Sequence, residues 1–410
     1  MTNPTCQNCG AHLSHTFADL GRMPVSNFNV KPEHLSEPDT LYPLLVRVCD
    51  RCLLVQADSV IDRSEHFSDD YQYFSSISPS WVEHARRYAD EVISRFGLNE
   101  QSLVIEVASN DGYLLQHFVA RGVPVLGIEP TRNTALAAIA RGVPTEVCFF
   151  GKATAERLKA QGQGANLITS NNVLAHVPDI NDFVSGFAEL LKPEGVWSCE
   201  FPHLLNLIEE GQFDTIYHEH YSYLSLIAVE SILARHGLRV FDVQELSTHG
   251  GSLRIFTCLA NASHVPQPGL AHARDKERAF GLHKLDTYQG FQQRAIDTRL
   301  ALRQFLEDAR DRGKTVAAYG AAAKGNTLLN FCDIGADLVH YVVDRNDQKQ
   351  GRYLPGSRIP ILAPEKIDET RPDYILILPW NLRSEIENQM AHARKWGAKF
   401  VVAIPALDVF

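Results

Sequence analysis

The sequence predicts an α/β protein that contains a doubly wound parallel sheet, and three observations support this prediction. The chain has 410 residues, which is more than one hydrophobic core usually supports, so two or three domains are expected. Apolar residues make up 45% of the chain and charged residues 21%, as in ordinary globular proteins. Short apolar runs alternate with helix-like segments over roughly 170 residues, which is the pattern of a doubly wound sheet.

Composition and charge argue against several classes of protein. The formal net charge is −10, the isoelectric point is about 5.9, and no basic tract is present, which argues against a dedicated nucleic-acid binder. No apolar run approaches the roughly eighteen residues that a membrane-spanning helix needs. The first residues, Met1–Cys6, lack the pattern of a secretory signal. We therefore expect a cytoplasmic enzyme with neither a nucleic-acid nor a membrane partner.

Four of the eight cysteines form two tight pairs near the N-terminus. Cys6 and Cys9 make one Cys-x-x-Cys pair, and Cys49 and Cys52 make the other. Two such pairs supply the four thiolates of a closed tetrahedral zinc site, which has no open position for a substrate. The sequence therefore predicts a structural Zn²⁺. Two unrelated redox pairs or four free thiols are the alternatives.

Continuous apolar runs predict the strands of the middle part of the chain, because strands of a parallel sheet are buried on both faces. One such run covers residues 103–108, further strands are expected at 123–128, 167–172 and 195–200, and residues 238–243 and 251–257 are expected to close the sheet as a pair. A turn of small and polar residues at 109–112 follows the first run and leads into a helix. The order of runs and helices predicts the doubly wound sheet.

An acidic residue, Glu129, ends the second predicted strand about twenty residues beyond the turn, where a carboxylate can accept hydrogen bonds from ribose hydroxyls. A dinucleotide site would need G-x-G-x-x-G at that turn, and the chain lacks it. The turn instead keeps the acidic-x-G-x-G-x-G spacing of methyltransferases with two glycines replaced. Its positions are Glu106, Ala108, Asn110 and Gly112. The sequence thus favours S-adenosylmethionine, with a nicotinamide cofactor as the alternative.

The densest group of chemically active side chains lies at residues 213–223. His218 and His220 alternate with Glu219, so in an extended segment both imidazoles would face one way and the carboxylate the other. A metalloprotease interpretation fails because H-E-x-x-H places its histidines one helical turn apart. The functional interpretation is a general base, His220 or His218, beside a phenol and a carboxylate. The structural alternative is a set of polar residues on a surface loop.

Taken in order, the motifs resemble the three-domain sugar C-methyltransferases that act on nucleotide-linked 4-keto-deoxysugars. The resemblance covers essentially the whole chain, through the paired cysteines and residues 71–76, 106–113, 171–176, 217–223, 249–254 and 319–327. It is strongest to the C-3′-methyltransferases that make branched amino sugars such as tetronitrose and kijanose. It therefore implies a dTDP-linked 3-amino-2,3,6-trideoxy-4-keto-glucose as substrate. Sister enzymes methylate sugars that lack the amine, or methylate C-5 instead.

The resemblance also implies roles for individual residues. His220 would be the base that removes the C-3′ proton, and Tyr217 would bind the ketone oxygen, with Glu219 and His176 near the sugar. Both Glu219 and His176 have an equally good structural interpretation. The implied cofactor contacts are Ala108, Asn110, Glu129, Pro130 and Asn172, with Glu106 and Gly112 in the same turn. Phe149 and Phe150 would flank the adenine or simply pack in the core.

The C-terminal part of the chain repeats the pattern of strand, glycine turn and helix. A helix is expected at 292–312, and strands are expected at 315–321, 339–344 and 374–379. A second cofactor site at the Gly320 turn is one interpretation. The one we favour is that this turn and the following helix N-terminus hold the phosphates of the sugar nucleotide. The expected substrate contacts are Tyr71, Lys324, Asn326, Trp380 and Asn381.

These observations combine into one prediction of fold and function. We expect a zinc-binding module at 1–73, a class I methyltransferase domain at 74–262, and a Rossmann-like α/β domain at 263–410 that contributes to the sugar-nucleotide cleft. The expected activity is C-3′ methylation in deoxysugar or antibiotic biosynthesis. The alternatives are an NAD-dependent nucleotide-sugar oxidoreductase and a zinc-ribbon interaction protein with an inert methyltransferase fold.

Overall fold

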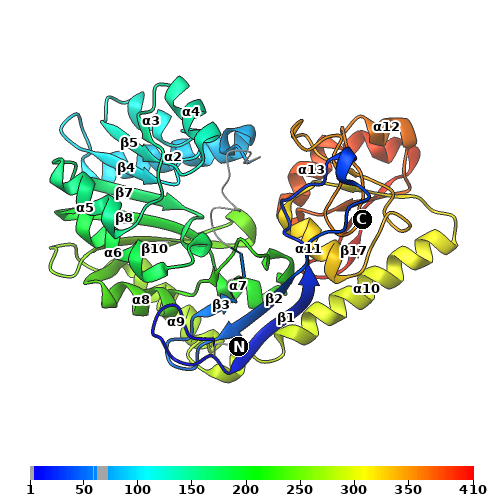
Figure 1. Cartoon of the computed structure of the whole chain (residues 1–410), viewed down its shortest axis with the longest axis horizontal. Helices are drawn as coiled ribbons and strands as arrows, with labels where there is room; N and C mark the ends of the chain where they lie inside the picture. The colour runs from blue at the N-terminus through cyan, green and yellow to red at the C-terminus, as the bar shows by residue number, and fades with distance from the viewer. Residues whose placement is uncertain (1–3, 59, 62–72) are drawn as a thin grey trace. The chain divides into compact units, whose positions relative to one another are not determined.

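The computed structural model describes residues 4–58, 60–61 and 73–410. The chain divides into two compact units, which are described separately (Figure 1). The first unit comprises residues 1–13, 49–204 and 221–284, and the second comprises residues 14–48, 205–220 and 285–410. Within the described ranges, no helix is both long and apolar enough to cross a membrane.

The first unit is built on a seven-stranded sheet with the order β10-β11-β8-β7-β4-β5-β6. Strands β4 to β8 are parallel, whereas β11 runs antiparallel to both β8 and β10. The strands are β4 (Val104–Val107), β5 (Val125–Ile128), β6 (Thr145–Glu146), β7 (Ala165–Asn171), β8 (Leu191–Pro202), β10 (Leu238–Leu246) and β11 (Ser252–Leu259). This confirms the predicted doubly wound sheet and its closing pair.

Helices cover both faces of this sheet (Figure 1). Side chains of α2 (Pro79–Phe96), α3 (Leu115–Val119) and α4 (Arg132–Ala140) share one apolar core with the sheet. Side chains of α5 (Lys152–Ala160), α6 (Ile180–Leu190), α8 (Leu226–Arg235) and α9 (Pro268–Phe280) share the other. A parallel sheet needs both faces covered, which is why every residue of β4 and of β5 is buried.

Local sequence determines where α2 begins and ends. The Ser78 hydroxyl accepts a hydrogen bond from the Trp81 backbone N–H at the N-terminus, and Pro79 occupies the first helical position. Both features favour helix initiation, because the first N–H groups of a helix have no partner inside the helix. The serine hydroxyl supplies a partner, and proline has no N–H group. The helix ends at Gly97, which has a left-handed backbone with a φ of 61°. Glycine adopts this conformation easily because it has no Cβ.

The segments that carry the paired cysteines belong to the first unit. Residues 4–13 form one turn that is flanked by an antiparallel bridge between Thr5 and His12, and β3 (Val55–Ala57) pairs antiparallel with β9 (Ser222–Tyr223). Cys6, Cys49 and Cys52 are buried in the apolar core that also contains side chains of α6 and α8. The zinc-binding module is therefore continuous with the core of the sheet.

The second unit contains a six-stranded sheet with the order β14-β13-β12-β15-β16-β17, parallel except for β17. The strands are β12 (Val316–Tyr319), β13 (Val342–Val343), β14 (Ile361–Leu362), β15 (Tyr374–Ile377), β16 (Lys399–Val402) and β17 (Asp408–Val409). The helices are α7 (Leu204–Glu209), α10 (Phe291–Asp311), α11 (Ala323–Phe331), α12 (Lys366–Thr370) and α13 (Arg383–Gln389). This sheet confirms the predicted Rossmann-like C-terminal domain.

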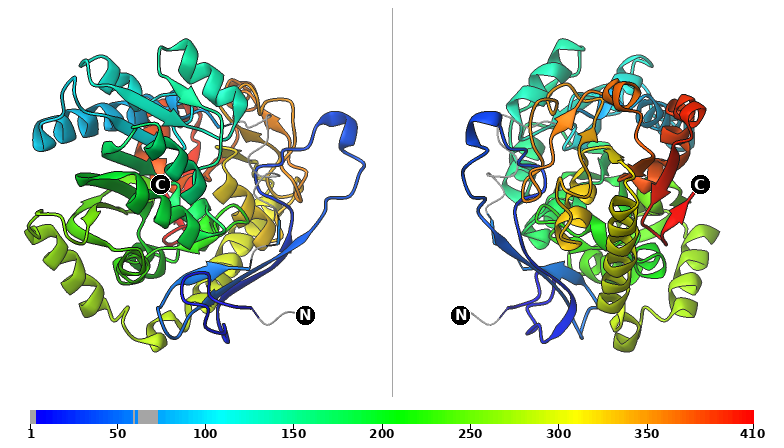
Figure 2. Two further views of the ribbon diagram at one scale, coloured as in Figure 1. Left: turned by 60° about the vertical axis from the view of Figure 1, so that its left-hand side comes forward. Right: turned by 90° about the vertical axis from the view of Figure 1, so that its right-hand side faces the viewer.

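Residues 14–48 belong to the second unit, although they fall within the zinc-binding module expected at 1–73. They contain the antiparallel pair of β1 (His15–Met23) and β2 (Tyr42–Val48). Figure 2 shows this blue hairpin beside the yellow α10. The ring of Phe17 stacks on Phe291 with 4.4 Å between centroids. The division of the chain at residues 73 and 262 stays a prediction.

Eight short 3-10 helices complete the described secondary structure. They are η1 (Pro32–His34), η2 (Ser75–Ile77), η3 (Leu174–His176), η4 (Phe213–Thr215), η5 (Thr248–Gly250), η6 (Leu285–Tyr288), η7 (Trp380–Leu382) and η8 (Ala391–Trp396).

Replacing Phe187 with Ala tests the core of the first unit. Phe187 is fully buried on α6 and stacks on Trp197 of β8, with 3.7 Å between ring centroids. The lost contacts and the cavity should lower the free energy of unfolding by about 3–5 kcal/mol. Urea denaturation followed by tryptophan fluorescence measures this change. The control is Leu136→Ala on α4, where a 53% exposed side chain should cost less than about 0.5 kcal/mol. Equal losses in both variants would contradict the described packing.

Candidate active site

The turn after β4 has a left-handed backbone at every second residue. Ala108, Asn110 and Gly112 have φ values of 56°, 49° and 78°. Glycine adopts such angles without strain, and asparagine adopts them more readily than other residues. At Gly112 space is a second constraint, because a Cβ there would lie 3.1 Å from Val143 Cγ2. The turn therefore keeps the shape of a glycine turn although two of its glycines are replaced.

Glu129 lies directly after β5 and is anchored to this turn. Its Oε2 accepts a hydrogen bond from the Asn110 backbone N–H at 2.8 Å, and its Oε1 accepts one from the Thr131 backbone N–H at 2.9 Å. The side chain is 4% exposed, and burial raises the pKa of its carboxyl. A carboxylate oxygen can accept more than one hydrogen bond, so Glu129 can still bind a ligand hydroxyl. Pro130 follows it and is half-buried.

Several buried oxygen atoms around the turn have no hydrogen-bond partner within the described part of the chain. They are Glu106 Oε2, Ser109 Oγ, Asp111 Oδ1, Asn171 Oδ1 and Asn172 Oδ1. Buried polar atoms in proteins are nearly always paired, so this group indicates a polar ligand. All five atoms accept hydrogen bonds, and S-adenosylmethionine offers ribose hydroxyls and an ammonium group as donors. The residues present therefore fit this cofactor.

The side chains of Asn110 and Asp111 hold the segment that precedes α2 against the turn. Asn110 Oδ1 accepts a hydrogen bond from the Ser75 backbone N–H at 2.9 Å, and Asn110 Nδ2 donates one to the Tyr73 carbonyl at 3.0 Å. Asp111 Oδ2 accepts one from the Ser76 hydroxyl. The side chain and the backbone N–H of Asn110 therefore both bond within the protein, and a contact of Asn110 with the cofactor stays a prediction. No motif in the sequence predicted these contacts.

Asn172, after β7, also has a left-handed backbone, with a φ of 57°. Its Nδ2 lies 3.1 Å from Nε2 of His249, whose φ is 54°. The Trp81 ring lies edge-on to His249 at 5.3 Å and stacks near Tyr113 at 6.0 Å. Non-glycine residues with such angles concentrate at functional sites. His249, Trp81 and Tyr113 had no predicted role, although the His249-Gly-Gly run could have drawn attention to the first.

Phe150 and His176 are the remaining predicted site residues of the first unit. Phe150 is 7% exposed, and its ring centroid lies 4.8 Å from that of Phe187 and 5.6 Å from that of Phe183. This packing favours a core role, and an adenine contact stays a prediction. His176 ends η3 and is half-buried. Tyr71 lies outside the described residues.

The predicted base lies in a turn of the second unit. His220 Nδ1 lies 2.8 Å from the Thr215 carbonyl oxygen, so Nδ1–H donates to it. In the neutral imidazole Nε2 then carries the lone pair that can accept a proton. The Tyr217 and His220 rings have centroids 4.0 Å apart. This arrangement presets the tautomer of His220 that a general base needs.

The segment around this base is a turn and not an extended strand, so the expected alternation of its side chains does not apply. The His220 backbone N–H donates to the Tyr217 carbonyl at 2.9 Å. His218 is 6% exposed beside the Tyr42 ring, and burial lowers its pKa. Glu219 is 4% exposed and accepts a hydrogen bond from Asn27 Nδ2 at 2.7 Å.

Three of the predicted substrate contacts come together in the second unit. Lys324 Nζ donates to Asn381 Oδ1 at 2.8 Å and lies 4.7 Å from the centroid of the Trp380 ring. Trp380 Nε1 in turn donates to Oδ2 of Asp214, a residue without a predicted role, at 2.8 Å. Asn326 is 1% exposed, and its side-chain nitrogen and oxygen have no hydrogen-bond partner among the residues described.

Packing explains the glycines of the turn after β12. A Cβ at Gly320 would lie 2.6 Å from Pro379, and a Cβ at Gly325 would lie 2.7 Å from Leu378. Asp344, the acid that ends the next strand, accepts a hydrogen bond from the Ala321 backbone N–H at 2.7 Å. These glycines and this acid therefore have structural roles that require no dinucleotide.

The four cysteine thiols of the first unit form one compact cluster. The Sγ atoms of Cys6, Cys9, Cys49 and Cys52 all lie within 4.8 Å of one another. The Cys6–Cys52 and Cys9–Cys49 distances are 3.5 Å. Tetrahedral zinc with bonds of about 2.3 Å separates its sulfur ligands by about 3.8 Å, so the cluster fits one Zn²⁺.

Matching backbone turns produce this cluster. The Gly10 N–H donates to the Cys6 carbonyl at 2.9 Å, and the Leu53 N–H donates to the Cys49 carbonyl at 3.0 Å. Both donors have a left-handed backbone, with φ values of 72° and 60°. Gln56 Nε2 lies 3.3 Å from Cys6 Sγ, where it supports a thiolate. The chain thus provides both the ligands and a polar contact around them.

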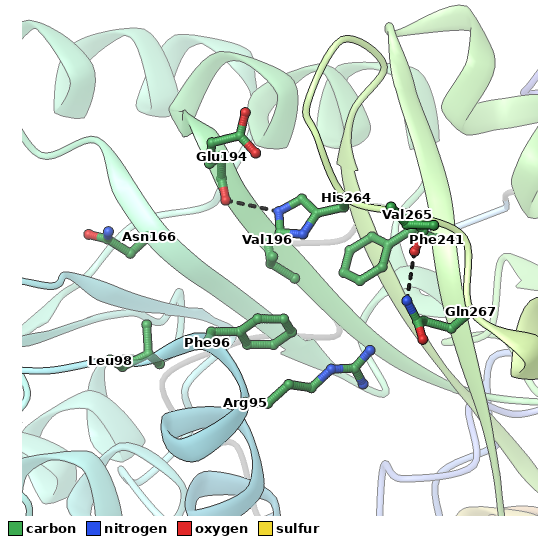
Figure 3. Close-up of a pocket in the computed structure, with 10 residues that line it drawn as sticks. All are labelled: Arg95, Phe96, Leu98, Asn166, Glu194, Val196, Phe241, His264, Val265 and Gln267. Atoms are coloured by element: carbon green, nitrogen blue, oxygen red, sulfur yellow. Dashed lines mark hydrogen bonds between the residues drawn. The ribbon is translucent and has the colours of Figure 1, made fainter.

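A separate pocket of about 540 Å³ lies near the amino ends of strands in the first unit (Figure 3). Its lining residues are Arg95, Phe96, Leu98, Asn166, Glu194, Val196, Phe241, His264, Val265 and Gln267. Arg95 is paired with Asp242 at 2.6 Å, and His264 stacks on Phe241. Doubly wound sheets bind their ligands at the carboxyl ends of the strands, where the cofactor turn lies. We therefore assign this pocket no part in the reaction.

The sheet order, the turn after β4 and the acid after β5 together define an S-adenosylmethionine-dependent methyltransferase. Family models agree: a methyltransferase domain matches residues 81–243, a zinc binding domain matches 6–67, and a C-methyltransferase C-terminal domain matches 247–405. The C-methyltransferase NovU of Streptomyces niveus is 37% identical over 400 residues, which are 98% of this chain and 95% of the relative. The chain therefore belongs to the C-methyltransferase family.

Other similarities are more distant. A ubiquinone biosynthesis O-methyltransferase of Bartonella bacilliformis is 27% identical over 94 residues, which are 23% of this chain and 38% of the relative. The crystal structure of magnesium protoporphyrin IX methyltransferase from Synechocystis PCC 6803 with bound SAM is 13% identical, covers 49% of this chain and 99% of its own, and has a TM-score of 0.36. None of these matches supports the oxidoreductase alternative.

Replacing Cys6 and Cys9 together with Ser tests the structural role of the metal. Two ligands are lost and a buried core element is disrupted, so we expect loss of bound zinc together with misfolding. Elemental analysis and circular dichroism measure both effects. Cys148→Ser, outside the cluster, should retain the metal. A double variant that stays folded without zinc would contradict a structural site.

The pH dependence of stability tests the environment of Glu219. Burial raises the pKa of its carboxyl to about 7. Between the ordinary pKa of an unfolded glutamate, about 4.3, and pH 7 the folded state holds a proton that the unfolded state releases, so stability falls as pH rises. Glu219→Gln should therefore be more stable than the parent by about 1–3 kcal/mol at pH 8 and little changed at pH 4.

Urea denaturation at the two pH values measures the gain from Glu219→Gln. Glu33→Gln, at an exposed position of the same unit, should show no gain at pH 8. If Glu219→Gln were less stable than the parent at pH 8, the folded protein would favour the ionised form of Glu219, which would contradict a raised pKa.

Proposed function

We propose that this C-methyltransferase moves a methyl group from S-adenosylmethionine to C-3′ of a dTDP-linked 3-amino-4-keto-deoxysugar. The observation that carries the proposal is the hydrogen bond from His220 Nδ1 to the Thr215 carbonyl, because it leaves Nε2 as the proton acceptor. A carbon beside a ketone becomes a nucleophile only after it loses a proton. A histidine with its base nitrogen preset supplies the step that this chemistry requires.

The proposed reaction begins with proton transfer. His220 Nε2 takes the proton from C-3′, and the electrons of the broken C–H bond form an enolate whose charge lies on the C-4′ oxygen. The Tyr217 hydroxyl donates a hydrogen bond to that oxygen as its charge grows. S-adenosylmethionine supplies an electrophilic methyl carbon. The enolate carbon bonds to this methyl, and the sulfur keeps the electrons of the broken S–C bond.

Contacts within the second unit support binding of the sugar nucleotide there. Lys324 lies on the first turn of α11, where backbone N–H groups and the helix dipole favour an anion. Asn381 and the Trp380 ring hold its ammonium group in place. We propose that Lys324 binds the diphosphate, and that Asn326, Trp380, Asn381 and Tyr71 contribute further contacts.

We assign the remaining predicted residues as follows. Glu219 positions the turn, because its carboxyl is buried and bound by Asn27. His176 is kept as an auxiliary polar contact to the sugar. Glu106, Ala108, Asn110, Gly112, Glu129, Pro130, Phe150 and Asn172 stay the proposed cofactor residues. With a dTDP-sugar substrate the enzyme would serve deoxysugar or antibiotic biosynthesis in the cytoplasm.

The proposal is tested by mass spectrometry of the dTDP-3-amino-4-keto-deoxysugar after incubation with enzyme and S-adenosylmethionine in deuterated buffer. We expect a product with one added methyl group on C-3′. Deuterium at C-3′ without methylation would show a working base and the wrong methyl donor. If neither methylation nor deuterium exchange is observed, the proposed substrate is wrong, and sugars without the amine or methylation at C-5 should be tested next.

Replacing His220 with Asn tests the assignment of the base. Turnover and deuterium exchange should both fall by about 10²–10⁴-fold, because no group remains to accept the proton. Binding of S-adenosylmethionine, measured by calorimetry, should be unchanged. His34→Asn, an exposed histidine of the same unit, is the control and should keep full turnover. Unchanged turnover in His220→Asn would remove the assignment.

A further inference from the structure

A buried carboxylate joins the turn that carries His220 to the sheet domain of the second unit. Asp214 is completely buried in η4. Its Oδ2 accepts the indole N–H of Trp380 at 2.8 Å, and its Oδ1 has no hydrogen-bond partner among the described residues. Burial raises the pKa of Asp214 to about 6, and the charge of Lys324 opposes that shift. Burying an ionisable group costs free energy unless the group is hydrogen-bonded or paired with an opposite charge.

The backbone links Asp214 directly to the orientation of the proposed base. Thr215 is the next residue, and its carbonyl accepts the Nδ1–H of His220. On the other side, Phe213 packs against Phe331 of α11, with 5.1 Å between ring centroids. The Thr215 carbonyl therefore lies on a turn that its own hydrogen bonds to the Gln212 carbonyl shape. The packing of Phe213 and the hydrogen bond of Asp214 attach this turn to α11 and to Trp380.

We propose that Asp214 is a positioning residue for His220: its hydrogen bond to Trp380 holds η4 so that the Thr215 carbonyl selects the Nδ1-protonated tautomer. This inference rests on the proposed role of His220 as the base. Without this hydrogen bond, η4 keeps its internal hydrogen bonds and the packing of Phe213 but loses its polar link to Trp380, so the Thr215 carbonyl can shift away from Nδ1. The two imidazole tautomers then interconvert, and only one of them has its base nitrogen at Nε2.

The chain offers substitutions that separate this hydrogen bond from the charge of Asp214. Trp380→Phe removes the N–H donor and keeps an aromatic ring beside Lys324. Asp214→Asn keeps an oxygen acceptor for the indole and removes the negative charge, whereas Asp214→Ala removes both. Trp396→Phe is the control, because Trp396 donates its indole N–H to the Pro372 carbonyl in the same unit.

The experiment records the tautomer of His220 in the full-length protein by long-range ¹H–¹⁵N correlation with ¹⁵N-labelled histidine. The His220 signal is assigned by its loss in His220→Asn. We expect the Nδ1-protonated form in the parent protein, in Trp396→Phe and in Asp214→Asn. Trp380→Phe and Asp214→Ala should show averaged tautomers and a kcat lower by about ten- to a hundredfold. In Asp214→Ala, which removes no proposed substrate contact, KM should change much less, because the loss concerns the chemical step.

Three results would overturn the proposal. One is a parent protein whose His220 is protonated at Nε2. Another is an unchanged tautomer in folded Trp380→Phe or Asp214→Ala protein. The third is an Asp214→Asn variant as impaired as Asp214→Ala, which would assign the effect to the charge beside Lys324. If Trp380→Phe fails to fold, the comparison of the two Asp214 variants and the parent tautomer decide the question.

The tautomer measurement does not depend on the substrate. If His220→Asn keeps its turnover while Trp380→Phe still changes the tautomer, the proposed base is wrong and the positioning by Asp214 stands. If His220→Asn is inactive and the tautomer never changes, the proposed function stands and this inference is wrong.

Discussion

The hydrogen bond between the Asn110 backbone N–H and the Glu129 carboxylate is the constraint on which the cofactor site depends. It joins the chain just after β4 to the chain just after β5, at the carboxyl ends of two paired parallel strands. The hydrogen bond requires the N–H of Asn110 to face β5. The left-handed backbone at Ala108 and Asn110 is found together with this orientation of the N–H. The other polar groups of the turn, including Glu106, are placed by this same path of the chain.

The sequence contained enough information to predict the fold. Segments such as 103–108 are apolar except for Glu106, because both faces of the sheet are covered, and such a pattern is visible without a structure. The cysteine pairs could be predicted for a similar reason, since the spacing within each pair is itself the geometry of a metal-binding turn. Both predictions depend on residues that are close together in the chain.

The parts that could not be predicted depend on residues far apart in the chain. Nothing near residue 214 indicates that Asp214 meets Trp380, because 166 residues separate them. The membership of residues 14–48 in the second unit likewise follows from the packing of Phe17 on Phe291. In an extended segment the two imidazoles of residues 217–220 would have faced one way and the carboxylate the other, whereas the hydrogen bond from the His220 backbone N–H to the Tyr217 carbonyl makes this segment a turn.

Three of the four cysteines that we expect to bind zinc are buried in the core shared by α6 and α8, so the stability of the first unit would depend on the supply of that metal. In a newly made chain that lacks the metal, no ion holds the four sulfur atoms together in the core beside the methyltransferase sheet. Such a chain exposes core surface, and exposed core surface is what chaperones and proteases recognise. Scarcity of the metal would therefore reduce the amount of enzyme in the cell, while each surviving molecule kept its full catalytic rate.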